Sequence, residues 1–360
     1  MKKEALAMVF NKAEKPFSAL SVKIPDLKPG EAIAEIAYST ICTSDLHSYY
    51  GRRSAPAPGV LGHEVIGRIT VLAEGGVTDY YGENLRTGDL VTWSVYAHDH
   101  EGAMAAKGIP QKSEPLFKYG HQKIEQHDVL SGGFATHCHL RKGTDIFKIP
   151  TGISFREAAP LNCTHATVAG AIRLAGNLKN KNVLIIGAGM LGVSACAMSK
   201  FSGANQVLAM DRTIQRTENT GRFGADQGID ANSSPEEVQR ITQAIGGIDV
   251  VIDTSGSAPA MEKGLQLLNI GGIAIWVGAV YSERNISINA ESVVRRILTI
   301  KGLHNYIPED LAFAIKFLES THLLYPFESL VEADFPLKAL DEAFRSANGS
   351  RKYRVGITPN

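Results

Sequence analysis

The sequence is 360 residues long, and its 37 basic residues balance its 37 acidic residues, so the formal net charge is zero. This balance gives no electrostatic footprint for nucleic acid or an anionic membrane surface, and no run of about twenty apolar residues indicates a membrane span. The 44% hydrophobic and 21% charged fractions are ordinary for a globular chain of about two domains. Four cysteines are too few for a disulfide scaffold, and the first residues lack the apolar core of a signal peptide, so we expect a cytoplasmic protein.

The first 150 residues are rich in short β-type runs. Alternating apolar and polar residues predict strands at 32–37, 65–71, 89–95 and 134–140. Between residues 93 and 131 this pattern gives way to a long polar stretch. Loops of this length are usually functional or stabilised by something specific.

From about Ser154 the pattern changes to strands that alternate with helices. Strands are predicted at 182–186, 206–210, 250–254 and 273–278, and an apolar helix at 190–201. This order is typical of a doubly wound parallel sheet. A helix near 310–319 and later strands are expected to return to the first domain. We therefore predict an α/β protein with a catalytic domain at 1–153 and 304–360 and a Rossmann domain at 154–303.

A glycine-rich motif lies between the strand at 182–186 and the helix that follows it. Its glycines are Gly187, Gly189 and Gly192, with Met190 and Leu191 before the third. The first glycine allows a tight turn, the second lets the backbone approach a pyrophosphate, and the third lets helix and strand pack closely. The helix N-terminus offers free N–H groups to the phosphates, so the motif predicts a dinucleotide site.

The choice between NAD and NADP depends on the end of the next strand. Asp211 stands about 20 residues after the motif, where a carboxylate hydrogen-bonds the ribose hydroxyls and repels a 2′-phosphate. We therefore expect NAD. Arg212 and Arg216 follow closely and leave NADP open, because an arginine there can accommodate that phosphate; the alternative is a solvated helix start.

Residue types that bind zinc stand far apart in the chain. Catalytic zinc takes three protein ligands and leaves one position open. We predict Cys42, His63 and Cys163 as these ligands. The remaining cysteines, Cys138 in a predicted strand and Cys196 in a predicted helix, are expected to be small buried hydrophobes.

These motifs occur together in one order: 41–47 with Cys42, 62–64 with His63, 162–165 with Cys163, and the glycine motif. In this combination the chain resembles the zinc-dependent medium-chain alcohol dehydrogenases over nearly its whole length. Segments 41–47, 51–54 and 118–121 resemble the branch associated with phosphonate catabolism. The resemblance implies a β-rich GroES-like catalytic domain beside the Rossmann domain.

The resemblance also implies roles for four residues near the metal. Ser44 and His47 form a relay that removes the alcohol proton by way of the cofactor ribose, and both side chains suit that chemistry. Asp45 orients the zinc-bound imidazole. Glu64 lies near the metal as an alternate ligand. For His47 a surface histidine is the competing interpretation.

Basic residues follow this segment. Arg52 and Arg53 border the substrate cleft in the relatives, and guanidinium groups bind phosphate-like oxyanions. This predicts a hydroxyalkylphosphonate or the matching aldehyde as substrate. The resemblance alone implies contributions from Lys118 and His304. Surface ion pairs or contacts to the cofactor phosphates are the alternative.

Many relatives hold a second, structural zinc with four cysteines. The corresponding positions here are Asp99, Gly102, Ala105 and Ser113, so all four thiols are absent and we predict that this site is lost. The histidines of the polar stretch and its surroundings could build another metal site, although a polar, partly mobile loop is the simpler interpretation. The residues considered are His98, Asp99, His100, His121 and His127.

The sequence thus predicts a zinc-dependent enzyme that transfers a hydride between a small-molecule alcohol and NAD. A polyol or threonine-type zinc dehydrogenase with the same machinery is the first alternative. A non-catalytic NAD-binding or sensor protein is the second, because fold alone does not fix function. The resemblance further implies a homodimer or homotetramer, and neither nucleic acid nor a membrane is expected as a partner.

Overall fold

The computed structural model describes residues 4–125, 129–281, 283–349 and 352–359. The chain forms two compact units. The first consists of Met1–Cys163, Ile307–His322 and Phe327–Asn360, and the second of Thr164–Tyr306 and Leu323–Pro326.

The first division between the units lies at 163/164 rather than at the expected 153/154. Helix α3 (Phe155–Ala158) is the reason, because it packs against strands of the first unit. Ser154 caps this helix by accepting a hydrogen bond from the N–H of Glu157 at 3.3 Å, and the Glu157 carboxylate accepts one from Ser154 N at 3.0 Å. The later division lies at 306/307, near the expected 303/304.

The first unit is mainly β-structure. Its strands are β1 (Glu4–Phe10), β2 (Ser18–Lys23), β3 (Ala32–Thr40), β4 (Gly59–Val60), β5 (Glu64–Leu72), β6 (Leu90–Ala97), β7 (Phe117–Lys118), β8 (His137–Leu140), β9 (Thr144–Lys148), β16 (Val331–Pro336) and β17 (Arg354–Thr358). Its helices, besides α3, are α1 (Thr43–Tyr49), α2 (Ala103–Ala106), α10 (Pro308–Thr321) and α11 (Leu340–Gly349), with short 3₁₀ turns at η1 (Pro110–Lys112), η4 (Phe327–Leu330) and η5 (Leu337–Ala339).

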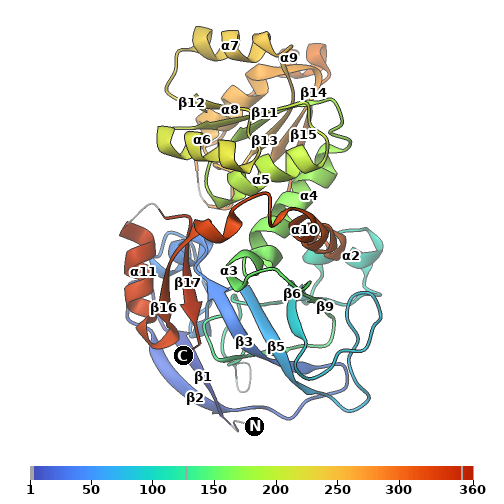
Figure 1. Ribbon diagram of the computed structural model, residues 1–360, viewed down its shortest axis with the longest axis vertical. Coiled ribbons are helices and arrows are strands. Elements are labelled where there is room, and N and C mark those ends of the chain that lie inside the picture. The colour runs from blue at the N-terminus through green and yellow to red at the C-terminus, as the bar shows by residue number, and fades with distance from the viewer. Residues whose placement is uncertain (1–3, 126–128, 282, 350–351, 360) are drawn as a thin grey trace. The chain divides into compact units, whose positions relative to one another are not determined.

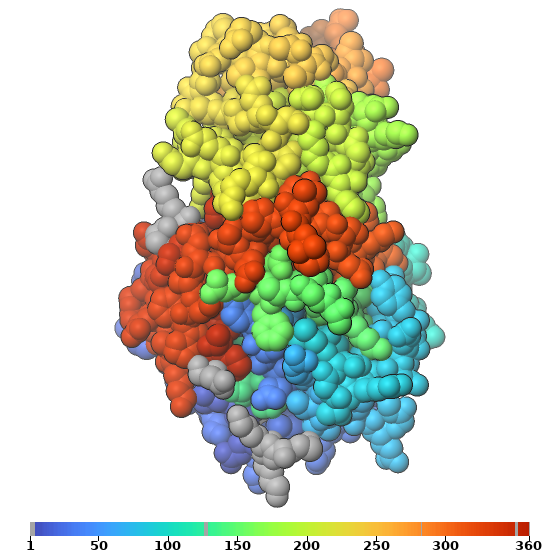
Figure 2. Space-filling model, viewed as in Figure 1, coloured from blue at the N-terminus to red at the C-terminus, as the bar shows by residue number. Residues whose placement is uncertain are grey.

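Residues from both ends of the sequence share one sheet in this unit. The strand order is β16-β17-β3-β5-β6-β7, with β8 on β3 and β9 on β6, and β2-β1-β4 form a smaller sheet. Strand β17 pairs antiparallel with β3, so the C-terminal segment lies against N-terminal strands (Figure 1). Figure 2 shows the same juxtaposition at the surface, where the red C-terminal residues adjoin the blue N-terminal ones.

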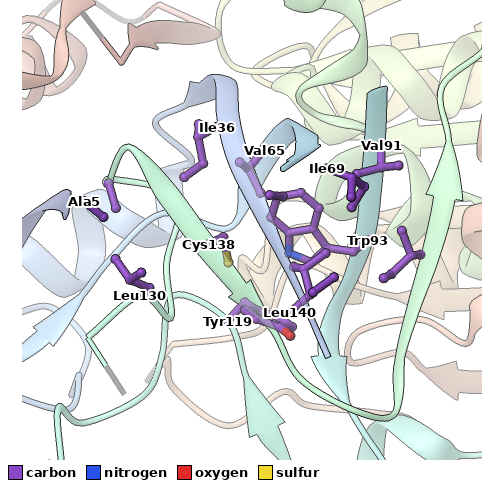
Figure 3. Packing of buried hydrophobic residues seen from close by; sticks show 14 of the residues in the cluster. Ala5, Ile36, Val65, Ile69, Val91, Trp93, Tyr119, Leu130, Cys138 and Leu140 are labelled. Atoms are coloured by element: carbon purple, nitrogen blue, oxygen red, sulfur yellow. The ribbon is translucent and has the colours of Figure 1, made fainter. Parts of the chain in front are cut away.

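The core of the first unit lies between these strands. Trp93 of β6 and Tyr119 are almost fully buried, and Figure 3 labels them with other members of the same cluster, among them Val65, Cys138 and Leu140. Cys138 is part of this cluster, and burial raises the pKa of its thiol well above the ordinary range. A second cluster joins Phe134 to Phe344 of α11.

The second unit is a parallel sheet with helices packed against it (Figure 1). Its strands are β10 (Asn182–Ile186), β11 (Gln206–Asp211), β12 (Gln227–Asp230), β13 (Ile248–Asp253), β14 (Leu268–Trp276) and β15 (Thr299–Gly302). Its helices are α4 (Ala166–Ala175), α5 (Met190–Phe201), α6 (Ile214–Thr220), α7 (Pro235–Ala244), α8 (Ala258–Leu267) and α9 (Ala290–Arg296), with a 3₁₀ turn at η3 (Gly221–Phe223). The strand order β12-β11-β10-β13-β14-β15 is that of a Rossmann sheet.

The predicted elements of this unit are confirmed with small changes at their ends. Strand β10 is buried along its whole length, as expected for a central parallel strand that reads as a continuous apolar run. Helix α5 begins at Met190, immediately after the glycine motif. Cys196 lies inside α5 with no exposed surface, and burial raises its thiol pKa. Among the described residues, no helix is long and apolar enough to cross a membrane.

Candidate active site

Three side chains of metal-binding type meet in the first unit. The ligand-type atoms of Cys42, His63 and Cys163 all lie within 4.8 Å of one another. Cys42 immediately precedes α1, and His63 immediately precedes β5. Cys163 lies in η2 (Leu161–His165), a single π-helical turn, a local widening of the helix that is common at functional sites. The predicted ligands therefore converge from three distant parts of the sequence.

The two thiols interact with each other. A hydrogen bond between their sulfur atoms holds the pKa of Cys42 well below its ordinary value and raises that of Cys163 well above it. The Arg354 guanidinium, whose Nη2 lies 3.6 Å from Sγ of Cys42, also lowers the pKa of Cys42. One thiolate is thus stabilised even without a metal ion.

Asp45 connects two of the three ligand positions. Its Oδ2 accepts a hydrogen bond from the N–H of Cys42 at 3.0 Å, and its Oδ1 accepts one from Gly62 at 3.3 Å. Oδ1 also lies 3.2 Å from Nδ1 of His63. Burial opposes the charged form of His63, but Asp45 and Cys42 outweigh it and raise the pKa of His63 to about 10. The surroundings of His63 therefore favour a positive charge at its imidazole.

The predicted relay residues stand on α1. Ser44 Oγ lies 3.2 Å from Nε2 of His63, the ring nitrogen opposite Asp45. His47 follows Ser44 by three positions, so the two side chains share one face of the helix. Burial lowers the pKa of His47, and the charges of Arg52 and Arg53 lower it further.

Glu64 forms an ion pair with Arg354. Its Oε2 accepts from Nε of Arg354 at 2.6 Å, and its Oε1 accepts from Nη2 at 2.7 Å. The Thr40 hydroxyl donates to Oε2 at 2.6 Å. Glu64 has no exposed surface, so Arg354 neutralises a fully buried carboxylate. Glu64 is not one of the three residues whose ligand-type atoms converge, but its charge acts on the thiol of Cys163, and its role as an alternate ligand stays a prediction.

Asn162 fixes the turn that carries Cys163. Its side-chain oxygen accepts from the N–H of Val65 in β5 at 3.3 Å, and its amide donates to the carbonyl of Trp93 in β6 at 3.0 Å. The neighbouring His165 points elsewhere, because its Nδ1 lies 2.9 Å from the hydroxyl of Ser194.

The structure separates the two predicted substrate arginines. Arg52 donates to Oδ1 of Asn348 at 2.7 Å and lies over the ring of Tyr50 at 5.3 Å. Its charge is thus held at an exposed position. Arg53 instead acts electrostatically on Lys118 and on His121. Among the described residues, neither Arg53 nor Lys118 has a carboxylate within ion-pair distance.

Lys118 and His121 lie close to the ligand group. Burial and the charge of Arg53 lower the pKa of Lys118 to about 8. The ring of His121 lies 5.3 Å from that of His63, and its Nδ1 donates to the carbonyl of Tyr119 at 3.1 Å. Burial, followed by the charges of His63 and Lys118, lowers the pKa of His121 well below its ordinary value.

The glycine motif in the second unit has the expected stereochemistry. Gly187 has a positive φ of 96°, and a Cβ there would lie 2.7 Å from Oγ1 of Thr254. A Cβ on Gly192 would lie 1.7 Å from the carbonyl oxygen of Gly187. At Gly189 a Cβ would approach only Arg216, at 3.8 Å. The middle glycine therefore borders open space, where a pyrophosphate would need close backbone approach.

Asp211 ends β11 beside this motif. Its Oδ2 accepts from the N–H of Ala188 at 2.8 Å, and its Oδ1 accepts from the N–H of Thr213 at 2.8 Å. Arg216, on α6, is the side chain nearest to Gly189, and Arg212 acts electrostatically on Tyr281. His304, predicted to contact substrate, belongs to the second unit.

Part of the stretch that follows β6 forms short regular elements. Strand β6 continues to Ala97, and α2 is held by backbone hydrogen bonds such as Ala106 N to Gly102 O at 3.0 Å. Ala105 lies within α2, Asp99 and Gly102 lie before it, and Ser113 directly follows η1. Residues 98–118 thus contain short regular elements, and the expected mobility of this stretch stays a prediction. His127 lies outside the described residues.

Two residues of this site were not found from the sequence. Arg354 gives no local signal apart from a charge in a strand whose neighbours Val355 and Ile357 are apolar. Asn162 is adjacent to Cys163, but its partners lie in β5 and β6. Both act through contacts over a long distance in sequence.

Comparison with known proteins identifies the family. Residues 28–151 match the model of the alcohol dehydrogenase GroES-like domain, and residues 191–320 match that of the zinc-binding dehydrogenases. The chain is 28% identical over 333 residues to 5-exo-hydroxycamphor dehydrogenase of Pseudomonas putida, covering 90% of each chain. It is 27% identical over 344 residues to sorbitol dehydrogenase of Halalkalibacterium halodurans, covering 93% and 94%. The crystal structure of an alcohol dehydrogenase from Thermotoga maritima superposes with a TM-score of 0.94 at 25% identity, over 99% of this chain and 100% of that one.

The chain belongs to the zinc-dependent medium-chain alcohol dehydrogenase family, with a GroES-like domain and a Rossmann domain. It is an oxidoreductase that acts on CH–OH donors, and its cofactors are zinc and a nicotinamide dinucleotide. The prediction of family, fold class and enzyme class from the sequence is confirmed.

Proposed function

We propose that Cys42, His63 and Cys163 bind the catalytic zinc ion and that the enzyme oxidises a hydroxyalkylphosphonate with NAD. The donor set fits zinc, because two sulfurs and one imidazole nitrogen converge in a buried place where one thiolate is already stabilised. Asp45 contacts Nδ1 of His63 and leaves Nε2 for the metal, the usual arrangement behind a ligand histidine.

Zinc in this place supplies Lewis acidity, which lowers the pKa of a bound hydroxyl towards neutrality. Ser44 lies beside the ligand nitrogen of His63, where its hydroxyl accepts the alcohol proton and passes it on. His47, on the same face of α1, receives a proton from that direction. Asp45 contacts both the backbone at the start of α1 and the imidazole of His63, so it fixes the position of Ser44 and His47 relative to the metal ligands.

The glycine motif would hold the dinucleotide, which would supply the hydride acceptor. Gly189 provides the open backbone for the pyrophosphate, next to the N-terminus of α5. Asp211 is anchored by two backbone N–H groups, so a carboxylate charge stands at the end of β11 and disfavours a 2′-phosphate. We therefore propose a preference for NAD over NADP. A kcat/KM that is higher with NADP than with NAD would indicate instead that Arg212 and Arg216 bind the 2′-phosphate of NADP.

The observation that carries the substrate proposal is the group of cations beside the metal ligands. Lys118 is partly withdrawn from water, stands near Arg53, and has no carboxylate partner among the described residues. A partly buried cation without a carboxylate partner costs free energy, and a dianionic phosphonate group offsets that cost. Arg53 adds a planar donor suited to phosphonate oxygens.

The test compares paired alcohols, a hydroxyalkylphosphonate and a neutral alcohol of similar length, in assays of NADH formation. Lys118→Met keeps the buried stem and removes the charge. We expect it to raise KM for the phosphonate about 10- to 100-fold, since charge-assisted hydrogen bonds contribute about 1.5–3 kcal/mol. KM for the neutral alcohol should stay nearly unchanged.

Arg53→Ala should act in the same direction as Lys118→Met. Arg52→Ala is the matched control, because Asn348 and Tyr50 hold its guanidinium at the surface. Equal effects of Lys118→Met on both alcohols, or turnover of neutral alcohols alone, would discard the phosphonate proposal and leave the zinc mechanism intact.

A polyol or threonine-type dehydrogenase is the second candidate. It is favoured by the similarity to sorbitol dehydrogenase over more than nine-tenths of each chain. Turnover of sorbitol with a kcat/KM above that of any phosphonate, together with an insensitive Lys118→Met variant, would favour this candidate.

We also propose a homodimer or homotetramer formed through the nucleotide unit. Strand β15 is the edge of the sheet as described, and an edge strand presents unpaired backbone groups. Large apolar side chains are exposed near it: Ile270 on β14, Val294 on α9 and Ile297 next to α9. Light scattering of the Val294→Asp variant should show smaller particles than the wild type, and identical masses would remove this assignment.

A further inference from the structure

A second group of metal-binding side chains lies outside the catalytic site. The ligand-type atoms of His98, His100 and Asp145 all lie within 4.8 Å of one another. His98 Nδ1 is 3.7 Å from Oδ2 of Asp145, and His100 Nε2 is 3.1 Å from Oδ1. The two imidazole rings stand edge to face with centroids 4.4 Å apart. One carboxylate thus faces two imidazoles.

The group is held in place by backbone contacts. His98 follows the end of β6, and its N–H donates to the carbonyl of Gly143 at 3.0 Å. Ala97 pairs with Thr144, which fixes β6 against β9 beside Asp145. The N–H of Asp145 donates to the hydroxyl of Ser94 at 3.1 Å. Two of the three side chains are therefore presented by a rigid pair of strands, a favourable basis for a metal site.

Two polar atoms in the group are buried and unsatisfied. His98 and Asp145 are 7% and 8% exposed, and neither Nδ1 of His98 nor Oδ2 of Asp145 has a hydrogen-bond partner among the described residues. Buried polar atoms without partners are rare in native proteins and point to a missing ligand. These two atoms are the facing pair 3.7 Å apart. A tetrahedral zinc ion with bonds of about 2.0–2.1 Å separates its ligand atoms by roughly 3.3 Å, so a small closure would satisfy both.

The surroundings admit a cation. A cavity of about 790 Å³ borders the group and is lined by His98, His100, Met104, Ser113 and Arg141, among others. The Arg141 guanidinium lies 3.5 Å from Oε1 of Glu31 and over the ring of Phe117, so its charge is already compensated. The carboxylate of Glu309 repels that of Asp145, which adds to the negative potential in the group.

We propose that His98, His100 and Asp145 bind a divalent transition-metal ion, with zinc as the physiological ion, that clips the lobe of residues 98–118 to β9. Two imidazoles and a carboxylate suit zinc and leave one position for water. The four positions that hold cysteines in relatives with a structural zinc occur in this same lobe as Asp99, Gly102, Ala105 and Ser113. The chain thus has a different metal clip at the place where the four-thiol site is missing.

The test measures metal content and cobalt spectra of the full-length protein. Wild-type protein equilibrated with Zn²⁺ should hold about two ions per chain, and His100→Ala and Asp145→Asn about one. His100 has an exposed side chain, so its replacement should not disturb folding. His322→Ala is the control for loss of an unrelated histidine and should keep both ions.

Cobalt distinguishes which ion is lost. Co²⁺ bound by thiolates shows sulfur-to-metal charge-transfer absorption, which a site of two imidazoles and a carboxylate lacks. We expect His100→Ala to lose one cobalt equivalent and keep the charge-transfer band, and Cys42→Ser to weaken that band and keep the second equivalent. A single ion in the wild type, or a second ion that survives both His100→Ala and Asp145→Asn, would overturn the proposal.

The clipping role has its own readout. Removal of the ion with a chelator, or the His100→Ala change, should speed proteolysis within residues 98–118, whereas cleavage elsewhere should be unchanged. Proteolysis that is equal with and without the ion would overturn the clipping role. None of these results depends on the substrate, so they remain interpretable whichever alcohol the enzyme oxidises.

Discussion

The replacement Asp45→Asn tests how the protein prepares the proposed catalytic zinc site. Asp45 accepts hydrogen bonds from two backbone N–H groups, those of Cys42 and Gly62, and faces Nδ1 of His63. An asparagine has the same shape but only one acceptor oxygen. If the asparagine oxygen accepts from Gly62 and faces His63, its NH₂ group points at the N–H of Cys42, so two donors face each other. In the opposite orientation the NH₂ group points at the N–H of Gly62 instead, and the same clash of donors results.

The magnitude follows from this count of acceptors. One buried donor facing another donor costs about 1–3 kcal/mol, and loss of an outer carboxylate typically weakens metal binding about 10- to 100-fold. Asp45→Asn should therefore weaken zinc binding by about 1.4–2.7 kcal/mol, the free-energy equivalent of that range. The measurement is a competition for zinc between the protein and a chromogenic chelator, which needs no activity.

Ser48→Ala is the matched control for this measurement. Ser48 is also a buried residue of α1, but its hydroxyl only donates to the carbonyl of Ser44, at 3.1 Å. Its replacement should leave zinc affinity within about twofold of the wild type, since it removes no group that contacts a ligand. An Asp45→Asn protein with wild-type zinc affinity would refute the reasoning.

Further predictions concern the relay, the nucleotide motif and a buried acid. His47→Ala should slow alcohol oxidation mainly below the alkaline range, and an unchanged pH–rate profile would exclude the relay. Gly192→Ala should abolish NADH binding, measured by fluorescence, because the added Cβ would lie 1.7 Å from a backbone oxygen. Gly189→Ala, whose Cβ would meet open space, should fold and bind NADH more weakly than the wild type. Burial raises the pKa of Asp253 to about 6 from 3.8, so its contribution to stability is greatest below pH 3.8 and is lost as the pH rises through 6. Asp253→Asn should remove roughly 2 kcal/mol of this pH dependence between pH 4 and pH 7 in urea unfolding, and an unaltered dependence would contradict the assignment.

The parts of the structure that the sequence predicted well are those with local causes. The glycine motif constrains its own backbone, so Gly187 and Gly192 could be assigned to a turn and a close contact before any coordinates were available. Strand β10 and helix α5 follow from apolar runs of the right length. Cys42, His63 and Cys163 could be selected because their residue types and surroundings are distinctive, and the fold brings them together.

The parts that were missed depend on contacts between distant segments. Arg354 and Glu64 are 290 positions apart, and neither segment shows that the two will pair. Asp145 looks like an ordinary polar residue of a strand until β9 aligns with β6 and places it against His98 and His100. The short elements α2 and η1 were not predicted, because they are held by backbone hydrogen bonds, which leave little trace in side-chain patterns.

The pairing of Arg354 with Glu64 also links the proposed zinc site to a strand that lies far along the chain. During synthesis, Cys42, His63 and Cys163 leave the ribosome well before β17, and the second unit is completed in between. Without Arg354, the fully buried Glu64 carboxylate would lose the two hydrogen bonds of this ion pair, so its burial next to His63 would cost free energy. We therefore expect the segment that carries His63 and Glu64 to reach its final packing only when β17 docks.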